Sequence, residues 1–250
     1  MRSRRNTRQK QGDDESRLFH SSCAFILGAR RRKRMDEKLF HLINEQWTNS
    51  AFDLFMPLIS YAEIWTPFFL IAAVALLIFG GFRGRAFVFC TALALGFSNL
   101  AVDPIKHAIG RPRPKQVQTV RMIELEKTQP MILTIFKKPR VRVSNAAERA
   151  RSGASFPSGH TNNNTVIAIC CTIFYWRWGK FYWVIAAAVA YSRIYLGAHW
   201  PSDVVATFFL AAGETLLILA FFELIWQKII SRRLPELVAR HPRLIPVSAS

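Results

Sequence analysis

The sequence predicts an all-α fold: a polytopic membrane bundle of five or six transmembrane helices, with an amphipathic helix at the membrane interface. Composition is the first supporting observation, because 51% hydrophobic and 13% aromatic residues exceed what an ordinary soluble domain carries. The second observation is that these residues are concentrated in long runs, and the third is that basic residues follow the runs. Together they indicate one domain that crosses a bilayer several times.

Five apolar stretches approach or exceed the roughly 20 residues needed to span a hydrocarbon core. They cover residues 66–81, 86–105, 165–178, 181–196 and 204–226. If each stretch crosses the membrane, the chain segments at Lys106, Pro157 and His199 lie on one face. The basic turns at Arg83 and Arg177 then lie on the opposite face.

The formal net charge of +18 arises from 34 Lys and Arg residues against 16 acidic residues. In a soluble chain this excess would suggest a nucleic-acid partner. Here the cations follow apolar stretches, as cytoplasmic connections do under the positive-inside rule. We therefore predict a membrane partner and no nucleic acid. The cations concerned are Arg83, Arg85, Arg177, Lys180, Lys228, Arg232, Arg233, Arg240 and Arg243.

The chain divides into three parts. Residues 1–34 form a basic leader that we expect to be disordered. Five spans would place this leader outside the cell, against the resistance of its basic residues to export, so we expect either a sixth crossing upstream or translation from Met35. Residues 35–227 form the membrane domain, and residues 228–250 form a basic cytoplasmic tail.

Two polar segments of the membrane domain also carry structural signals. Between residues 36 and 60 apolar residues recur at helical spacing, which predicts the amphipathic interfacial helix. Residues 106–155 form a polar loop between the second and third apolar stretches. Within this loop, residues 131–136 and 141–143 are predicted to form strands.

Three polar clusters stand at the ends of apolar stretches on the same predicted face, and each holds residues suited to a phosphate dianion. The first runs from Lys106 to Arg113-Pro114, the second is Pro157-Ser158-Gly159-His160, and the third runs from Ser192-Arg193 through His199 to Asp203. Any one of them is a weak signal. Three in this order, each at a helix end, form a specific pattern.

The three clusters resemble the three-part signature of the type-2 phosphatidic acid phosphatase family, which is K-x6-R-P, P-S-G-H and S-R-x5-H-x3-D. No departure from that signature is visible, and the resemblance covers residues 36–226. The family also includes soluble vanadium haloperoxidases, which hold vanadate in the same pocket but lack membrane spans. The resemblance therefore implies a membrane-bound phosphatase.

Phosphate binding is assigned to five residues. Arg113 and Arg193 can each offer a two-pronged donor, and Lys106 adds a point charge. Pro157 suits the first turn of a helix, so we expect the backbone N–H groups of Ser158 and Gly159 to point at the anion. A transferring phosphoryl group spreads negative charge over its oxygens and needs several such donors.

The two histidines divide the remaining chemistry. His199 lies four residues before Asp203, so a near-helical turn brings the carboxylate to the imidazole, fixes its tautomer and makes His199 the nucleophile. His160 has no such partner nearby and is better placed as the general acid, and later as the base that activates water. The resemblance implies the same roles.

Simpler explanations exist for single residues. Lys106 or Arg113 alone could be the cationic flank of a span, and Asp203 could be a helix-terminus charge. Arg193 carries the most weight, because a cation deep in an apolar run is costly and usually functional. Three further residues fall outside the signature and are expected to be solvated or to steer phosphate: His107, Arg111 and Lys115.

We therefore predict a hydrolase that removes a phosphomonoester or pyrophosphate from a lipid headgroup through a phosphohistidine, with no cofactor and no metal. Candidate substrates are undecaprenyl pyrophosphate, phosphatidylglycerol phosphate, phosphatidate and lipid A phosphate. The predicted location is the cell (inner or plasma) membrane, with the active site on the extracytoplasmic face. The alternative is a non-catalytic protein that binds or transports lipid phosphates, since intramembrane charge also marks transport paths.

Overall fold

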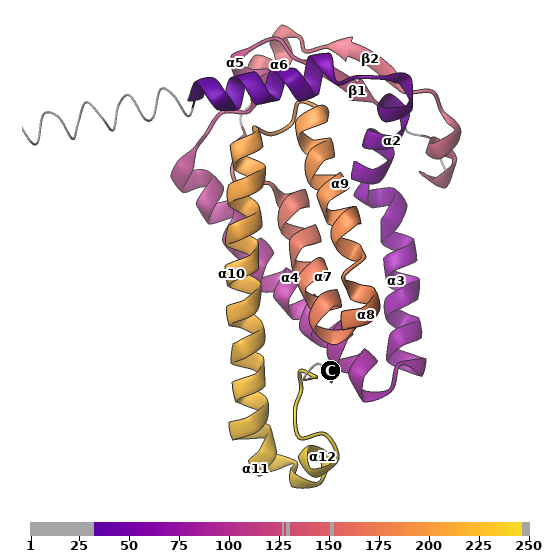
Figure 1. Cartoon of the computed structure of the whole chain (residues 1–250), viewed down its shortest axis with the longest axis vertical. Helices are drawn as coiled ribbons and strands as arrows, with labels where there is room; N and C mark the ends of the chain where they lie inside the picture. Colours follow the sequence, from indigo (N-terminus) through magenta and orange to yellow (C-terminus); the bar gives the residue numbers. More distant parts are fainter. Residues whose placement is uncertain (1–32, 127, 129–130, 151–152, 247–250) are drawn as a thin grey trace, which may run out of the picture.

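The structure is a computed structural model that describes residues 33–126, 128, 131–150 and 153–246. Long helices stand side by side as a bundle, and a layer of shorter elements covers one end of it (Figure 1). Most of the predicted leader, residues 1–32, lies outside the described residues.

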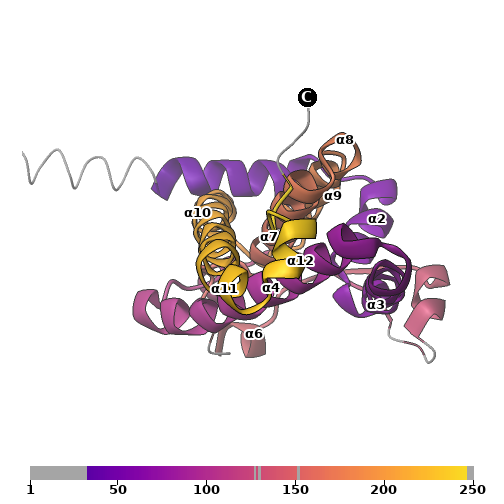
Figure 2. The ribbon, with the colours of Figure 1, turned by 90° about the horizontal axis from the view of Figure 1, so that it is seen from below.

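Each of the five apolar stretches lies mainly within one helix, and the end of the third stretch forms the short helix α8 (Trp176–Gly179). The five main helices are α3 (Ala62–Phe79), α4 (Gly81–Ile109), α7 (Gly159–Phe174), α9 (Tyr182–Tyr195) and α10 (Pro201–Ile225). Viewed from below, α7 lies between α10 on one side and α3 on the other, while α4 runs obliquely along one edge (Figure 2). The helix α7 contacts α4, α9 and α10, so it forms the centre of the bundle.

Three helices in the described part of the chain are long and apolar enough to cross a membrane, namely Ala62–Phe79, Gly81–Ile109 and Pro201–Arg233. The central helices α7 and α9 have 16 and 14 residues. At a rise of 1.5 Å per residue they are about 24 and 21 Å long, shorter than the ~30 Å hydrocarbon core. The predicted total of five or six spans stays a prediction.

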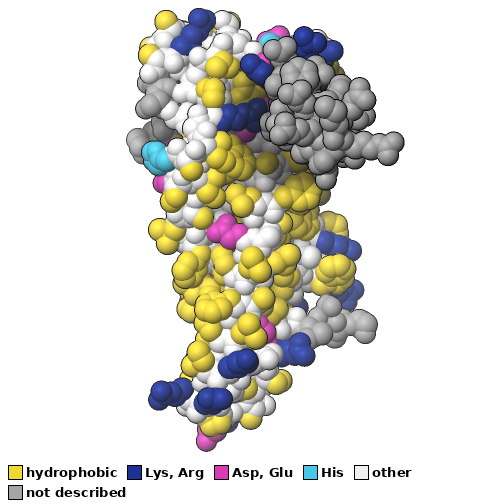
Figure 3. Space-filling view, turned by 90° about the vertical axis from the view of Figure 1, so that its left-hand side faces the viewer, with side chains coloured by type: hydrophobic (Ala, Val, Ile, Leu, Met, Phe, Trp, Pro, Cys, Tyr) yellow, Lys and Arg dark blue, Asp and Glu magenta, His cyan; other side chains and the backbone are white. Residues whose placement is uncertain are grey.

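The bundle has two apolar cores. One joins α4, α7 and α10 and includes Cys90, Val166, Phe174 and Leu219. The other lies under the covering layer. Between the two ends the outer surface is dominated by apolar side chains, while Lys and Arg gather towards the ends (Figure 3). This is the surface pattern of a protein surrounded by lipid at its middle.

The segment predicted to be one interfacial helix forms two helices instead. A helix over residues 33–41 continues into η1 (Leu42–Gln46), and α2 (Ser50–Ser60) follows after a break. The break is explained by Asn49, whose side chain accepts a hydrogen bond from the backbone N–H of Phe52 and so starts a new helix. We call residues 33–46 the N-terminal helix; it lies across the ends of α9 and α10 (Figure 1).

The apolar face of the N-terminal helix is covered by protein. Phe40 and Ile43 are buried against Tyr195, Trp200 and Val204. The prediction that this segment is amphipathic is correct. Its apolar face, however, completes the upper core of the bundle.

The polar loop after α4 folds over the same end of the bundle. Its elements are α5 (Pro114–Val117), β1 (Arg121–Glu124), η2 (Met131–Phe136), β2 (Arg140–Val143) and α6 (Ala146–Ala150). The strand predicted at 141–143 is confirmed as part of β2, which pairs antiparallel with β1. The strand predicted at 131–136 is wrong, because this segment forms a 3-10 helix. A short apolar run does not distinguish these structures by periodicity.

The C-terminal segment continues α10 and then turns back. After η3 (Trp226–Ile230), α11 (Ser231–Arg233) and α12 (Pro235–Arg240), the His241 ring stacks on Phe82 at a centroid distance of 3.9 Å. The backbone N–H of Ile245 donates to Glu223 at 2.9 Å. Part of the predicted tail is thus held against the bundle.

Asn44 joins three elements, and its loss should destabilise the fold. Its fully buried amide donates to Tyr195 O at 2.7 Å and Arg121 O at 3.0 Å, and its Oδ1 accepts from Arg121 N at 3.1 Å. Because each buried group left unsatisfied costs about 1–3 kcal/mol, Asn44→Ala should lower the free energy of unfolding by about 2 kcal/mol or more.

Thermal denaturation of purified protein in detergent measures this effect. Asn99→Ala is the matched control, because the exposed Asn99 side chain donates to Leu95 O within its own helix. An equal melting temperature for the two variants would contradict the role given to Asn44.

Candidate functional site

Four helix ends meet under the covering layer. The C-terminal ends of α4 and α9 and the N-terminal ends of α7 and α10 all lie at the upper end of the molecule in Figure 1. The three polar clusters of the sequence stand at these ends. The bundle therefore brings together residues that are up to 97 positions apart, from Lys106 to Asp203.

The turn between α9 and α10 depends on one glycine. Gly197 has φ +69°, and an added Cβ would lie 3.1 Å from Val120 Cγ2 and 3.2 Å from Arg121 O. Only glycine fits this left-handed position without strain. The tight turn that follows α9 positions His199.

His199 is buried and is held by the main chain of Ser155. The distance from His199 Nδ1 to Ser155 O is 2.5 Å. Since a carbonyl oxygen only accepts hydrogen bonds, Nδ1 carries the proton and Nε2 keeps its lone pair. The imidazole is thus held in the tautomer that makes Nε2 a nucleophile.

Asp203 lies in the first turn of α10 but its contacts differ from those expected. Its carboxylate accepts from Ser155 Oγ at 2.5 Å, Arg111 Nη1 at 2.5 Å and Trp200 N at 3.2 Å. Among the hydrogen bonds of the described residues, none joins Asp203 directly to the His199 ring. The direct pairing expected from the four-residue spacing is replaced by a bridge through Ser155, because α10 begins only at Pro201 and the turn before it is not helical.

Two arginines supply positive charge beside the histidines. Arg193 Nη1 donates to Ser60 Oγ at 2.5 Å, and its buried Nε has no hydrogen-bond partner among the described residues. Arg113 Nε donates to Ala154 O at 3.3 Å. A buried guanidinium with an unused donor is suited to an anion.

Charge and burial set the protonation of His199. Burial first, and then the positive charges of Arg193 and Arg113, lower the pKa of His199 well below its ordinary value. Burial also lowers the pKa of Arg113. The imidazole is therefore neutral at physiological pH.

Lys106 stands at the same end of the bundle but is less closely integrated. It lies in the last turn of α4, and its Nζ pairs with Asp103 one turn earlier at 3.2 Å. Among the described residues, no hydrogen bond joins it to the two histidines or to Arg113 and Arg193.

The helix α7 begins two residues later than expected. Ser158 is its N-cap and Gly159 its first residue, so Pro157 precedes the helix. The Ser158 N–H donates to Thr207 Oγ1 at 2.9 Å, so it is already engaged within the protein. At Gly159 an added Cβ would meet nothing within 4 Å, which leaves space beside the backbone at the start of α7. The geometry therefore leaves room for an anion near the backbone of Gly159, whereas the N–H group of Ser158 is already used within the protein.

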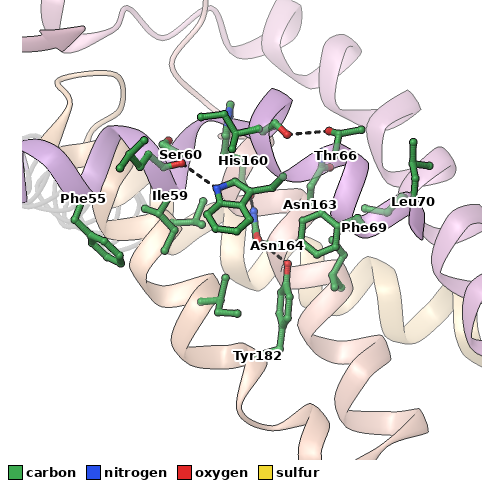
Figure 4. Close-up of a pocket in the computed structure, with 18 of the residues that line it drawn as sticks. Phe55, Ile59, Ser60, Thr66, Phe69, Leu70, His160, Asn163, Asn164 and Tyr182 are labelled. Atoms are coloured by element: carbon green, nitrogen blue, oxygen red, sulfur yellow. Dashed lines mark hydrogen bonds between the residues drawn. The ribbon is translucent and has the colours of Figure 1, made fainter. Parts of the chain in front are cut away.

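His160 faces a large apolar cavity of about 700 Å³. Ser60, the last residue of α2, lines the same cavity. In Figure 4, Ser60 and His160 lie near each other among the lining residues, with the hydrogen-bonded pair Asn164 and Tyr182 below them.

The cavity opens on the apolar surface of the bundle. It is lined mainly by apolar side chains of α2, α3, α7 and α9, and several of these are themselves exposed: Phe55, Trp65, Phe69 and Leu70. A second cavity of about 310 Å³ is lined by Arg193, Ser60 and Glu124. Ser60 thus lines both, at the boundary between an apolar and a more polar space.

Four residues that sequence reasoning did not assign contribute to the site: Asp36, Ser60, Arg111 and Ser155. Ser155 lies just before the second cluster and Arg111 lies within the first. Their closeness in sequence to these clusters was the signal that could have identified them. Asp36 and Ser60 come from the N-terminal helix and α2, and neither lies near a predicted cluster. Among the described residues, no group of three or more His, Cys, Asp or Glu residues is arranged to hold a metal ion.

Comparison with known proteins gives one family and two similar structures. The model of the PAP2 superfamily matches residues 86–227. The structure of LpxE from Aquifex aeolicus is 21% identical, with a TM-score of 0.53, covering 73% of this chain and 93% of that one. A transmembrane PAP2-type phosphatidylglycerolphosphate phosphatase from Bacillus subtilis is 21% identical, with a TM-score of 0.54, covering 80% and 92%. Comparison with curated protein sequences gives no match.

An oxyanion should bind between Arg113 and Arg193 and stabilise the protein. Orthovanadate or tungstate should raise the melting temperature, because a ligand at 100 times its Kd adds about 2.7 kcal/mol to the stability of the folded state. Arg193→Ala should abolish this increase. Arg85→Ala, at the opposite end of the bundle, should retain it. A shift that persists undiminished in Arg193→Ala would place the anion elsewhere.

Proposed function

Because the chain belongs to the PAP2 superfamily, we propose that it is a membrane phosphatase that hydrolyses the phosphate or pyrophosphate ester of a lipid headgroup without a metal ion. The observation that carries the proposal is the position of the polar site beside the apolar cavity. His160 lines that cavity, and Arg193 lies on the other side of Ser60. Such a site suits a molecule with an apolar chain and an anionic head.

In the proposed reaction, Nε2 of His199 attacks the phosphorus atom and the bond to the lipid oxygen breaks. His160 protonates the leaving oxygen, and the phosphoryl group remains on His199. Water then attacks the phosphohistidine, His160 takes a proton from that water, and phosphate leaves. The Ser155 carbonyl keeps the proton on Nδ1 of His199 throughout.

Transition-state charge would be met by fixed cations in place of a metal ion. The positive charges of Arg193 and Arg113 both lower the pKa of His199, so these two residues would lie near a phosphorus atom attacked by His199. The unused Nε donor of Arg193 would bond to an equatorial oxygen. The open space beside Gly159 would admit the phosphate to the N-terminus of α7. Lys106 would add longer-range attraction.

The substrate candidates are undecaprenyl pyrophosphate, phosphatidylglycerol phosphate, phosphatidate and lipid A phosphate. The Bacillus subtilis protein of similar fold is described as acting on phosphatidylglycerolphosphate, which supports a lipid phosphate as the class. All four candidates share a phosphate at headgroup depth and at least one long apolar chain. The cavity of about 700 Å³ has room for the part of such a chain nearest the headgroup.

We propose that the site faces the extracytoplasmic side of the cell (inner or plasma) membrane. The turn between α3 and α4 carries Arg83 and Arg85, and the turn between α7 and α9 carries Arg177 and Lys180. Both turns lie at the end of the bundle opposite the site (Figure 1). Cytoplasmic loops carry such an excess of Lys and Arg.

Phosphate release from the four lipids tests the proposal. Purified protein in detergent should release phosphate from at least one of them in the presence of EDTA, and orthovanadate should inhibit. His199→Ala should lower kcat by a factor on the order of 10³ or more, because it removes the nucleophile. His107→Ala is the matched control, since His107 is an exposed residue in the last turn of α4 and is not one of the residues assigned to catalysis or phosphate binding. Binding of all four lipids without turnover would favour the non-catalytic alternative.

The pH dependence should report a neutral His199. Since its pKa is lowered, the imidazole stays unprotonated when the pH falls through the ordinary histidine value of about 6.5. The rate of phosphoenzyme formation under saturating lipid should therefore decline only well below that pH. Arg193→Gln removes a positive charge and should move the decline to higher pH. A midpoint at or above 6.5 in the unmodified protein would contradict this account.

A further inference from the structure

Arg111 joins the N-terminal helix to the start of α10. Its Nη1 donates to Asp203 Oδ1 at 2.5 Å and to Ser202 Oγ at 2.7 Å, while its Nη2 donates to Asp36 Oδ2 at 2.5 Å. The guanidinium also lies over the Trp200 ring, at 5.7 Å from the centroid. Arg111 is thus engaged by protein groups on both prongs, which leaves little of it for a phosphate.

Asp36 completes the connection from the other side. Its Oδ1 accepts from Ser202 N at 2.8 Å, and its Oδ2 accepts from Ser202 Oγ at 2.7 Å. Both carboxylates of this group are buried, and the Arg111 side chain is 33% exposed. A carboxylate removed from water needs such partners, so neither Asp36 nor Asp203 is free to take another position.

Ser155 connects Arg111 and Asp203 to His199, the proposed nucleophile. Ser155 Oγ donates to Asp203, Ser155 N donates to Arg111 O at 2.6 Å, and Ser155 O accepts from His199 Nδ1. Ser155 is therefore fixed by Arg111 through its own N–H and through Asp203. The orientation of the His199 ring depends on where this carbonyl is held.

The same group also sets the charge behind the ring. One guanidinium between two carboxylates leaves a net charge of −1, which favours the positive charge that the ring gains when Nε2 is phosphorylated. The charged or titratable groups that act on His199 from other elements are Arg193, Arg113 and His160. These oppose a positive ring, and the net negative charge of Asp36, Arg111 and Asp203 would act in the opposite direction.

We infer that Arg111 and Asp36 are positioning residues, which hold Ser155 and Asp203 so that the His199 ring is aimed at the phosphorus atom. The N-terminal helix is then a required part of the active site. The catalytic part of this inference rests on the proposed phosphatase function. Arg111 lies within the first cluster but outside the signature positions, and Asp36 lies outside all three clusters and outside the range matched by the family model.

The experiment has one arm that is independent of turnover. Protein labelled with ¹⁵N-histidine is titrated by NMR in detergent, and His199 is assigned by its absence in His199→Gln. Arg111→Ala leaves two unneutralised carboxylates and should raise the pKa of His199. Asp36→Asn removes one negative charge at nearly constant volume and should lower it. Opposite shifts from two contacting residues are not expected from a general loss of stability.

The second arm measures kinetics on the lipid that the unmodified protein hydrolyses. Arg111→Ala and Asp36→Ala should each lower kcat by on the order of 10-fold or more with little change in KM. The His199 ring would no longer be oriented towards the phosphorus atom, whereas the residues that contact the phosphate would be unchanged. Arg111→Lys keeps the positive charge but cannot donate two parallel hydrogen bonds. Its His199 pKa should therefore be close to that of the unmodified protein, while its kcat should remain low. The double variant should lose no more than the worse single variant.

The control is another ion pair at the same end of the bundle. Arg121 and Asp53 are joined at 2.6 Å but make no contact with Ser155 or His199 among the described residues. Asp53→Asn should leave the His199 titration and kcat unchanged. If Arg111→Ala does not fold, Asp36→Asn and Arg111→Lys decide the question.

Two results would overturn the inference. One is an unchanged His199 titration in both Arg111→Ala and Asp36→Asn. The other is an effect of Arg111→Ala on KM alone, which would make Arg111 a phosphate ligand. If the unmodified protein hydrolyses none of the lipids, the proposed function fails, while the NMR arm still decides whether these residues position His199.

Discussion

A cation buried at the end of a helix is the constraint on which this site depends. Arg193 lies in the last turn of α9, where the helix dipole favours positive charge, and part of its hydrogen-bonding capacity is unused. A desolvated guanidinium is costly unless an anion approaches it. The N-terminus of α7 and the charge of Arg113 favour an anion at the same place. The helix ends and the cations together form the phosphate subsite of the proposed reaction.

The surroundings of this subsite divide into an apolar and a polar side. The larger cavity lies among α2, α3, α7 and α9 and opens on the apolar surface, while the smaller one has Glu124 and Arg193 in its wall. Ser60 lines both cavities, and its hydroxyl accepts a hydrogen bond from Arg193. A lipid phosphate has the same division, since its chain avoids water and its head requires polar partners.

The upper layer has a role beyond covering the bundle. Phe40 and Ile43 fill the core above α9 and α10, and on the same helix Asp36 holds Ser202 and Arg111. Packing and hydrogen bonding therefore act together on the turn that carries His199. A single segment near the start of the described chain closes the core and organises the nucleophile.

The sequence by itself determined the helical class, the five apolar helices and the end of the bundle at which the polar clusters meet. It could do so because apolar run length and the placement of Arg and Lys are local properties of the chain. The His199, Arg193 and Arg113 assignments had the same origin, since each residue stands within a few positions of a helix end.

Only the tertiary structure decided the partners of those residues. The spacing of His199 and Asp203 favoured a direct pair, yet Ser155 lies between them because it arrives from a loop 44 residues earlier in the chain. The roles of Asp36, Arg111 and Ser60 likewise depend on contacts across 75 to 166 positions. Periodicity and spacing carry no information about such contacts, because they are fixed by how the helices pack and by the need of each buried polar group for a partner.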